Sequence, residues 1–294
     1  MSSIKSKNVS REDKNAIQGG VLYLVATPIG NLSDISERAL KTLNEVDIVA
    51  AEDTRNTGKL LAYFGISKPM ISYFEHNKRE RGEAIVEKLE SGLSCALVTD
   101  AGMPAISDPG EDLVRLCAQR GITVTCVPGC SAVVSALALS ALSTGRFCFE
   151  GFLSTNKNER FKRLNEIKND TRTTIFYEAP HKLKKTLSDI FEVFGERKIS
   201  LCRELTKLNE EIFRTTLSEA ISYYEQNEPR GEFVLVIEGK SEADIINDAF
   251  WVQMSIEEHF EHYIALGYSK MDAIKAVAKD RGVPKNEIYK IINS

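Results

Sequence analysis

The sequence lacks most of the patterns that mark common classes of binding protein. Its six cysteines form no CxxC pair, and several lie in apolar runs where free thiols behave as small core residues, so we predict no metal site and a reducing, cytoplasmic location. No apolar stretch reaches the roughly 18 to 20 residues that span a bilayer, so no membrane contact is expected. The near balance of 38 basic and 42 acidic residues argues against a surface that coats nucleic acid throughout, although a local basic patch remains compatible with it.

The first half of the chain alternates short apolar runs with helix-like periods. Strands are predicted at residues 21–26, 46–51, 95–99 and 122–127, because these runs are rich in Val and Ile, as buried parallel strands are. A helix is predicted after Asn31, with Asp34 as its N-cap and Glu37 three residues later. This order predicts an α/β domain with a mainly parallel sheet over residues 20–143. Residues 1–19 are polar, lack the apolar centre of a signal peptide, and are expected to form a flexible tail.

The second half has a different pattern. Strand-like segments follow one another with fewer helices between them, which predicts a mixed α+β domain over residues 144–241, joined to the first at Thr144-Gly145; the segments lie at residues 146–153, 172–180, 198–205, 211–217 and 231–239. Residues 250–294 predict a helix-turn-helix-like extension of three short helices, with Ser269 and Asp272 as a cap and a break at Gly282. Its last 27 residues hold six Lys or Arg against three Asp or Glu. The extension is either a contact for a partner or a cap packed on the second domain.

Four loops follow the predicted parallel strands, at residues 27–31, 52–55, 100–110 and 128–132. Ligands of open α/β sheets bind beyond the carboxyl ends of the strands, so these loops are the predicted binding site, although Gly and Pro there could simply end the strands. The chain has neither GxxxxGK[ST] nor GxGxxG, and Pro28 offers no N–H, so a phosphate-bearing cofactor is disfavoured. A ligand with an adenosine, an amino-acid end and no phosphate, such as S-adenosylmethionine, fits better.

Six segments carry a family resemblance. They resemble the tetrapyrrole-methylase superfamily, and more closely its ribosomal branch. In chain order over residues 21–239 the segments read LYLVATPIGNLSDISERAL, VDIVAAEDTRNTGKLLAYFGI, ALVTDAGMPAISDPG, VPGCSAVVSALALSAL, IFYEAPHKL and RGEFVLVIEG. The resemblance implies two α/β domains with S-adenosylmethionine in the cleft between them, and a homodimer. It also implies methylation of the 2′-hydroxyl of a cytidine in the decoding region of 16S rRNA, so the small ribosomal subunit is the expected partner.

The resemblance also implies a set of cofactor contacts. They are Pro28, Gly30, Asp100, Ala101, Gly102, Pro104, Pro128, Ser131, Ala132, Tyr177 and Ala179. Two positions depart mildly from the common superfamily form: Met103 stands where Thr is usual, and Cys130 stands where Pro is usual.

Catalytic and RNA-binding roles are predicted from charged residues near these loops. We expect Asp53, Arg55 and Glu178 to position the target ribose, with Glu52, His181 and Glu204 also open as bases. Alternatively, Asp53 and Arg55 form a structural ion pair. Two basic segments could bind RNA phosphates or could be ordinary solvated faces; they contribute Arg79, Arg81, Lys157, Arg160, Lys162 and Arg163.

Two other functions remain compatible with the sequence. The same fold and cofactor could serve methylation of a corrinoid or porphyrin-like small molecule. A non-catalytic RNA-binding factor of ribosome assembly would belong to another class, although intact cofactor loops count against it.

Overall fold

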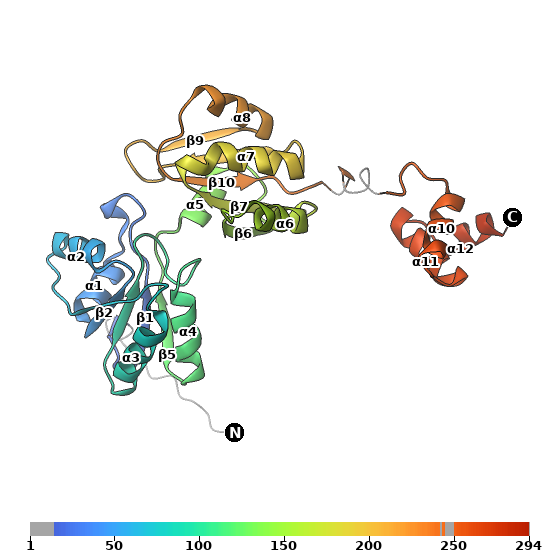
Figure 1. The fold of residues 1–294 in the computed structure, drawn as a ribbon. Helices are drawn as coiled ribbons and strands as arrows, with labels where there is room; N and C mark the ends of the chain where they lie inside the picture. Colours follow the sequence, from blue (N-terminus) through green and yellow to red (C-terminus); the bar gives the residue numbers. More distant parts are fainter. Residues whose placement is uncertain (1–14, 242, 245–249, 294) are drawn as a thin grey trace, which may run out of the picture. The chain divides into compact units, whose positions relative to one another are not determined.

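A computed structural model describes residues 15–241, 243–244 and 250–293 (Figure 1). The chain divides into two compact units, of which the first comprises Met1–Asn165 and Arg172–Glu238, and the second Glu166–Thr171 and Gly239–Ser294. The first unit contains both sheets of the fold. Residues 1–14 of the expected tail lie outside the described residues, whereas Ile17 packs against the core and the Gln18 N–H donates to the Tyr23 hydroxyl at 2.8 Å.

The first sheet has five parallel strands in the order β3-β2-β4-β1-β5. Their bounds are β1 Val21–Val25, β2 Ile48–Ala51, β3 Met70–Ser72, β4 Cys95–Val98 and β5 Thr123–Val127. Four of them are the predicted strands, and the predicted fold class, with one parallel and one mixed sheet plus C-terminal helices, is confirmed. The fifth strand, β3, was not predicted, because it has three residues and none of them is fully buried.

Alternating side chains of this sheet build two cores. Val21, Tyr23 and Val25 face helices α1 (Glu37–Glu45) and α2 (Thr54–Tyr63). Leu22 faces α3 (Lys78–Glu90) and α4 (Gly110–Gln119), so both faces are covered and the strand carries almost no polar residue. The predicted cap of the first helix was wrong: Asn31 caps a short 3₁₀ turn over Leu32–Asp34, and the Ser36 hydroxyl accepts the Ala39 N–H to begin α1.

The second sheet is mixed, in the order β6-β7-β10-β8-β9. Its strands are β6 Phe147–Phe152, β7 Thr173–Glu178, β8 Lys198–Arg203, β9 Glu211–Thr216 and β10 Phe233–Ile237, which matches the five predicted segments. Its helices are α6 (Lys157–Ile167), α7 (Pro180–Phe194) and α8 (Leu217–Gln226), with α7 and α8 packed side by side over the sheet (Figure 1).

Helix α5 (Ala132–Leu139) connects the two sheets. It follows the last strand of the first sheet, but its buried Val133, Ala136 and Leu137 pack against residues of β7, β8 and β10. The chain therefore passes from one sheet to the other near residue 131, ahead of the joint expected at Thr144-Gly145. This early crossing brings the loop before α5 to the boundary between the sheets.

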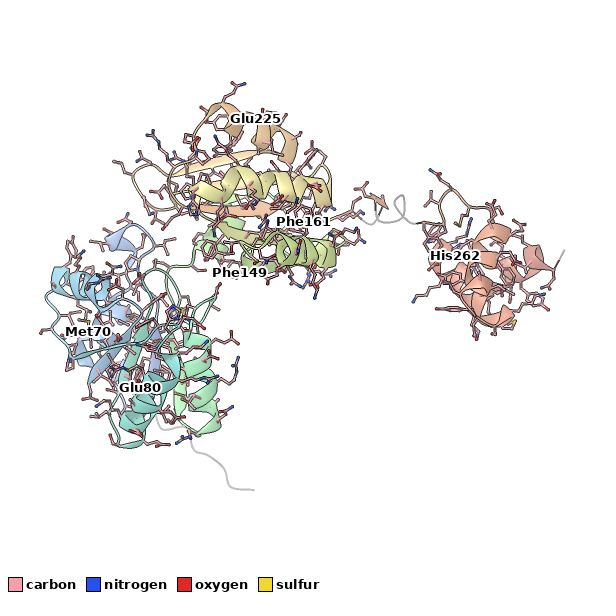
Figure 2. All side chains as sticks on the ribbon, in the orientation of Figure 1. Met70, Glu80, Phe149, Phe161, Glu225 and His262 are labelled. Atoms are coloured by element: carbon pink, nitrogen blue, oxygen red, sulfur yellow. The ribbon has the colours of Figure 1, made fainter. Side chains whose placement is uncertain are left out.

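Three of the helices described in the second unit build a small core of their own. They are α10 (Ile256–Ala265), α11 (Lys270–Arg281) and α12 (Lys285–Ile292), and Ser269 caps α11 through the Asp272 N–H as predicted. Gly282 ends α11 with φ of 65°, a left-handed conformation that favours glycine. His262, labelled in Figure 2, lies on α10, where its ring contacts Phe250 and Tyr263. None of the described helices is long and apolar enough to cross a bilayer.

Candidate active site

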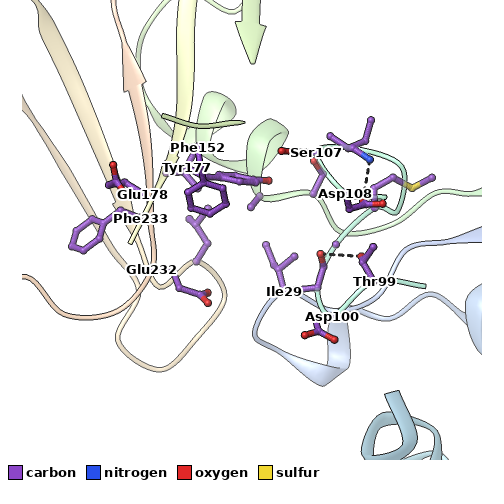
Figure 3. Close-up of a pocket in the computed structure, with 18 of the residues that line it drawn as sticks. Ile29, Thr99, Asp100, Ser107, Asp108, Phe152, Tyr177, Glu178, Glu232 and Phe233 are labelled. Carbon is purple, nitrogen blue, oxygen red and sulfur yellow. Dashed lines mark hydrogen bonds between the residues drawn. The ribbon is translucent and has the colours of Figure 1, made fainter. Parts of the chain in front are cut away.

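A cavity of about 510 Å³ lies within the first unit, beside the carboxyl ends of the strands of the first sheet. From the second sheet it meets the carboxyl ends of β6, β7 and β8 and the amino end of β10, which runs antiparallel to β7 and β8. Figure 3 shows Ile29, Thr99 and Asp100 on one wall, and Phe152 and Tyr177 on the opposite wall. One wall therefore comes from the first sheet and the other from the second. Its volume suits a ligand of nucleoside size, because small-molecule sites commonly enclose about 300–1,000 Å³.

The loops of the first wall are bonded to one another. Thr27 and Gly102 exchange backbone hydrogen bonds of 2.9 and 3.0 Å, which joins the loop after β1 to the loop after β4. Gly102 has φ of 85°, so a side chain here would strain the backbone. Asn56 of α2 donates to the Asp100 carboxylate at 3.2 Å, so the loop after β2 joins the same assembly.

Gly30 brings the first wall into contact with the second. A Cβ added there would lie 2.4 Å from Lys207 Cγ and 2.9 Å from the Leu205 carbonyl oxygen. Both residues belong to the loop between β8 and β9, and both line the cavity. Only glycine permits this approach, so its absent side chain serves the contact between the two halves of the site.

Carboxylates dominate the charge of the lining. The acidic residues are Glu52, Asp100, Asp108, Glu178 and Glu232, against which Lys207 is the one cation among the lining residues. The Lys207 ammonium is engaged by Glu204 and Glu232, each at 2.9 Å. Burial raises the pKa of Glu52, and the nearby charges of Asp100 and Asp108 raise it further. The cavity therefore favours a cationic ligand and disfavours a phosphate.

Seven of the eleven predicted cofactor contacts line the cavity. They are Asp100, Ala101, Gly102, Ser131, Ala132, Tyr177 and Ala179. The other four, Pro28, Gly30, Pro104 and Pro128, do not line it, and Gly30 instead contacts the β8–β9 loop. From the loop after β1 the structure places Ile29 in the lining, although the prediction named the residues on either side of it.

The structure separates the three residues predicted to position the ribose. Glu178 lines the cavity, but its two oxygens accept hydrogen bonds from the Ala179 N–H at 2.8 Å and the Thr186 hydroxyl at 2.6 Å. Asp53 and Arg55 are not lining residues. Asp53 caps α2 and holds the Arg55 guanidinium at 2.8 Å, and these bonds lower the pKa of Asp53 to about 2, which is the arrangement of the structural ion pair considered as the alternative.

The predicted RNA-binding residues also differ in their surroundings. Arg79 and Arg81 are exposed on the first turn of α3, beside Glu80 (Figure 2). On α6, Lys162 is exposed, Lys157 lies 5.0 Å from the centre of the Phe161 ring, and the Arg163 guanidinium pairs with Glu150.

Arg160 corrects the expectation for this segment. It is only 4% exposed, and its guanidinium donates to Asp189 at 2.7 Å and to the carbonyl of Ser154 at 2.7 Å. A buried group with these partners cannot reach a phosphate, because contact would require both bonds to break.

Comparison with known proteins identifies the family. A model of the tetrapyrrole (corrin/porphyrin) methylases matches residues 21–221. A ribosomal RNA small subunit methyltransferase I of Halalkalibacterium halodurans is 50% identical over 281 residues, covering 96% of both chains. That of Bacillus subtilis is 47% identical over 271 residues, covering 92% of this chain and 93% of its own. The chain belongs to the ribosomal RNA small subunit methyltransferase I family. It is therefore a member of a methyltransferase family, as the sequence predicts.

Solved structures of other proteins share the fold at low identity. A cobalt precorrin-4 methyltransferase aligns with a TM-score of 0.56 at 17% identity, covering 74% of this chain and 95% of its own. A diphthine synthase aligns with a TM-score of 0.57 at 15% identity, covering 75% of this chain and 90% of its own. These likenesses establish the fold of this member of the methyltransferase I family and nothing about its substrate.

Several lining residues were not among the predicted site residues. They include Thr99, Ile106, Asp108, Phe152, Leu205, Lys207, Glu232, Phe233 and Val234. Thr99 is the last residue of a predicted strand and Asp108 lies inside the predicted loop at residues 100–110, which is a signal that could have found them. Phe152 and Val234 lie in strands whose side chains read as ordinary core residues, so the sequence offers no signal for them.

Proposed function

We propose that the protein transfers the methyl group of S-adenosylmethionine to the 2′-hydroxyl of a cytidine in the decoding region of 16S rRNA. The observation that carries the proposal is the 50% identity, across nearly the whole chain, to a ribosomal RNA small subunit methyltransferase I. A substrate of this kind agrees with the expected cytoplasmic location. The nucleotide and the ribose position rest on the family resemblance described above.

The lining suits S-adenosylmethionine by its chemistry. When bound, the cofactor supplies an electrophilic methyl group on a positively charged sulfur, next to an ammonium and a carboxylate. Glu52 and Asp100 would supply negative charge to the sulfonium or the ammonium, and the apolar side chains of Ile29 and Val234 would supply surface to an adenosine. The loops Asp100–Gly102 and Ser131–Ala132 contribute backbone groups to the lining. These groups carry no charge, so they suit a ligand that has no phosphate.

The chain's own residues align the reacting groups. In the transfer, a carbon–oxygen bond forms at the ribose as the methyl–sulfur bond breaks, and the hydroxyl proton leaves to a base or to water. Alignment alone contributes up to about 7–11 kcal/mol in favourable systems. Glu178 is best placed to hold Ala179 and Pro180 against the ligand, because its two oxygens accept the Ala179 N–H and the hydroxyl of Thr186 on α7. Asp53 and Arg55 would act only through α2, whose first turn they fix.

The decisive experiment follows tritiated methyl groups into RNA. Small subunits that lack the modification are incubated with the protein and labelled S-adenosylmethionine, and ribose methylation is then mapped. We expect one labelled cytidine in the decoding region. Label on a base, or label only in an added corrin or porphyrin, would contradict the proposal, and tight cofactor binding without transfer to any RNA would favour an assembly factor.

Glu52 should make cofactor binding depend on pH. Its pKa is raised above 4.5, so it holds its proton at higher pH than an ordinary glutamate. The attraction for a cation is complete above that raised pKa and is lost as the pH falls through it. Calorimetric titration across the pH range in which the protein stays folded should show this loss in the wild type and a flatter profile in Glu52→Gln.

Asp53→Asn is the matched control for that titration. The pKa of Asp53 is about 2, so its charge stays constant over the same range and its substitution should leave the profile unchanged. A wild-type profile that is already flat would show that Glu52 does not face the bound cation.

The exposed cations of α3 and α6 support a path for RNA phosphates. Neutralising Arg79 and Arg81, or Lys157 and Lys162, should lower the slope of log affinity against log salt by about 0.7–0.9 for each phosphate that the variant no longer neutralises. Arg115 is the control, since it is exposed but paired with Glu111 and Asp112. Equal slopes for all variants would place the RNA elsewhere.

We also propose that the protein is a homodimer. Strand β5 forms an edge of the first sheet, and exposed apolar side chains follow it on α5, with Val134 58% and Leu139 38% exposed. Unpaired edges and exposed apolar groups are favourable to association. Light scattering on the purified protein should give twice the chain mass of 32.8 kDa.

A further inference from the structure

Strand β6 ends in an irregularity that lies next to an aromatic residue of the cavity wall. Its register with β7 shifts between Phe149 and Gly151, and Gly151 has φ of 65°. A Cβ at Gly151 would lie 2.9 Å from Ser107 Oγ, so the end of β6 closely approaches the loop after β4. The next residue, Phe152, lines the cavity with its ring 5.5 Å from that of Tyr177 (Figure 3). The bulge therefore coincides with the placement of an aromatic ring at the site.

The facing loop is held in an unfavourable conformation. Ala105 and Ser107 have φ of 67° and 64°, in the left-handed region that side chains other than glycine seldom adopt. Asp108 maintains it by accepting the N–H groups of Ala105, Ile106 and Gly110. Between the two left-handed residues, Ile106 lines the cavity. Such conformations persist where surrounding contacts fix them, and they gather at functional sites.

Phe152 and Ile106 are unusual among the large apolar lining residues because both are largely exposed. Phe152 is 58% and Ile106 52% exposed, whereas Phe233 is 2% and Leu205 6% exposed. They come from separate segments that meet at Gly151 and Ser107. An aromatic ring and a branched apolar chain at an open part of a cavity are suited to a flat, unstacked base, whose faces are apolar.

We propose that Phe152 and Ile106 form a clamp that holds the nucleobase of the methylated nucleotide. The proposal rests on the proposed function, because it assigns that RNA substrate to this part of the cavity. The carboxylates Glu52 and Asp100 are suited to the cation of the cofactor, which leaves the exposed apolar pair for the substrate. Because stacking acts on any base face, the clamp would orient the ribose and contribute little to base selection.

The test compares Phe152→Ala and Ile106→Ala with Phe147→Ala. Phe147 is a matched control, since it lies on the same strand, is 41% exposed and does not line the cavity. Loss of stacking should raise KM for RNA, or the Kd of a cytidine oligonucleotide, roughly 5- to 150-fold. Phe152→Trp should restore binding, the Kd of S-adenosylmethionine should stay constant, and kcat should change less than KM.

A substrate that lacks only the target base distinguishes a clamp on that base from other roles of Phe152, such as contact with the cofactor. With an abasic ribose at that position, wild type and Phe152→Ala should bind equally. A difference that persists on the abasic RNA, or a weakened cofactor Kd, would overturn the clamp and assign Phe152 to the adenine of the cofactor. If the wild type transfers no methyl group, the proposed function fails, and oligonucleotide binding still decides the clamp. If transfer proceeds and Phe152→Ala behaves as wild type, only the clamp fails.

Discussion

Replacing Arg160 with alanine should lower the free energy of unfolding by about 3–5 kcal/mol, the usual loss when one partner of a buried ion pair is removed. Arg160 and Asp189 are 4% and 7% exposed, and Arg160 also bonds the carbonyls of Ser154 and Thr155. Without the guanidinium, the Asp189 carboxylate stays buried without its cation, and the loop before α6 loses its anchor. Urea unfolding followed by circular dichroism measures the change.

Two variants make this result specific. Lys162→Ala, on the same helix at an exposed position, should change stability by no more than about 0.5 kcal/mol. Adding Asp189→Ala to Arg160→Ala should recover part of the loss, because the uncompensated charge is gone. If Arg160→Ala instead weakened RNA binding with unchanged unfolding, the residue would be the phosphate contact that the sequence first indicated.

The burial of Arg160 could have been predicted from the helical spacing of the residues around it. Arg160, Leu164 and Ile167 are spaced by four and three residues, which places them on one face of a helix. Leu164 and Ile167 are 0% and 9% exposed, so this is the buried face of α6. Reading the segment as a run of basic residues ignored its helical period, and periodicity was the stronger evidence.

Every described strand of the two sheets except β3 was predicted, and in the central strands burial leaves a compositional signal. The apolar runs of β1 and β4 predict their bounds to within one residue, and loops at their carboxyl ends are where ligands bind in such sheets. Which side chains of those loops turn inward was not predictable. Ile29 lines the cavity while Pro28 and Gly30 do not, since that choice depends on the bridge from Thr27 to Gly102 and on the β8–β9 loop.

The carboxylates beside the cavity show the same limit. Glu52 and Asp53 are adjacent and chemically alike, so the sequence offered no reason to prefer either. Asp53 accepts the Arg55 N–H and begins α2, whereas Glu52, the last residue before that cap, lines the cavity. The opposite effects on their pKa values follow from that one-residue difference: hydrogen bonds to Arg55 lower that of Asp53, and burial raises that of Glu52.

Gly30→Ala should disturb both stability and cofactor binding. The added methyl would lie 2.4 Å from Lys207 Cγ, 2.8 Å from Thr206 Oγ1 and 2.9 Å from the Leu205 carbonyl oxygen. The Lys207 side chain can move aside, but the backbone carbonyl cannot move without shifting the β8–β9 loop. Overpacking of this kind costs about 1–3 kcal/mol. Because Leu205 and Lys207 line the cavity, the same shift should raise the Kd of S-adenosylmethionine.

Gly58→Ala gives the matched control for that experiment. Gly58 lies within α2, and a Cβ there would meet only Met70 Cε at 3.4 Å, an ordinary contact. Alanine in a helix interior is favoured over glycine by about 0.5–1 kcal/mol, so this variant should be slightly more stable and bind the cofactor normally. Calorimetry and thermal unfolding measure both quantities. Normal cofactor binding by Gly30→Ala would mean that the contact between the loops after β1 and β8 does not set the shape of the cavity, and the single glycine of the TPIGN segment would then need another explanation.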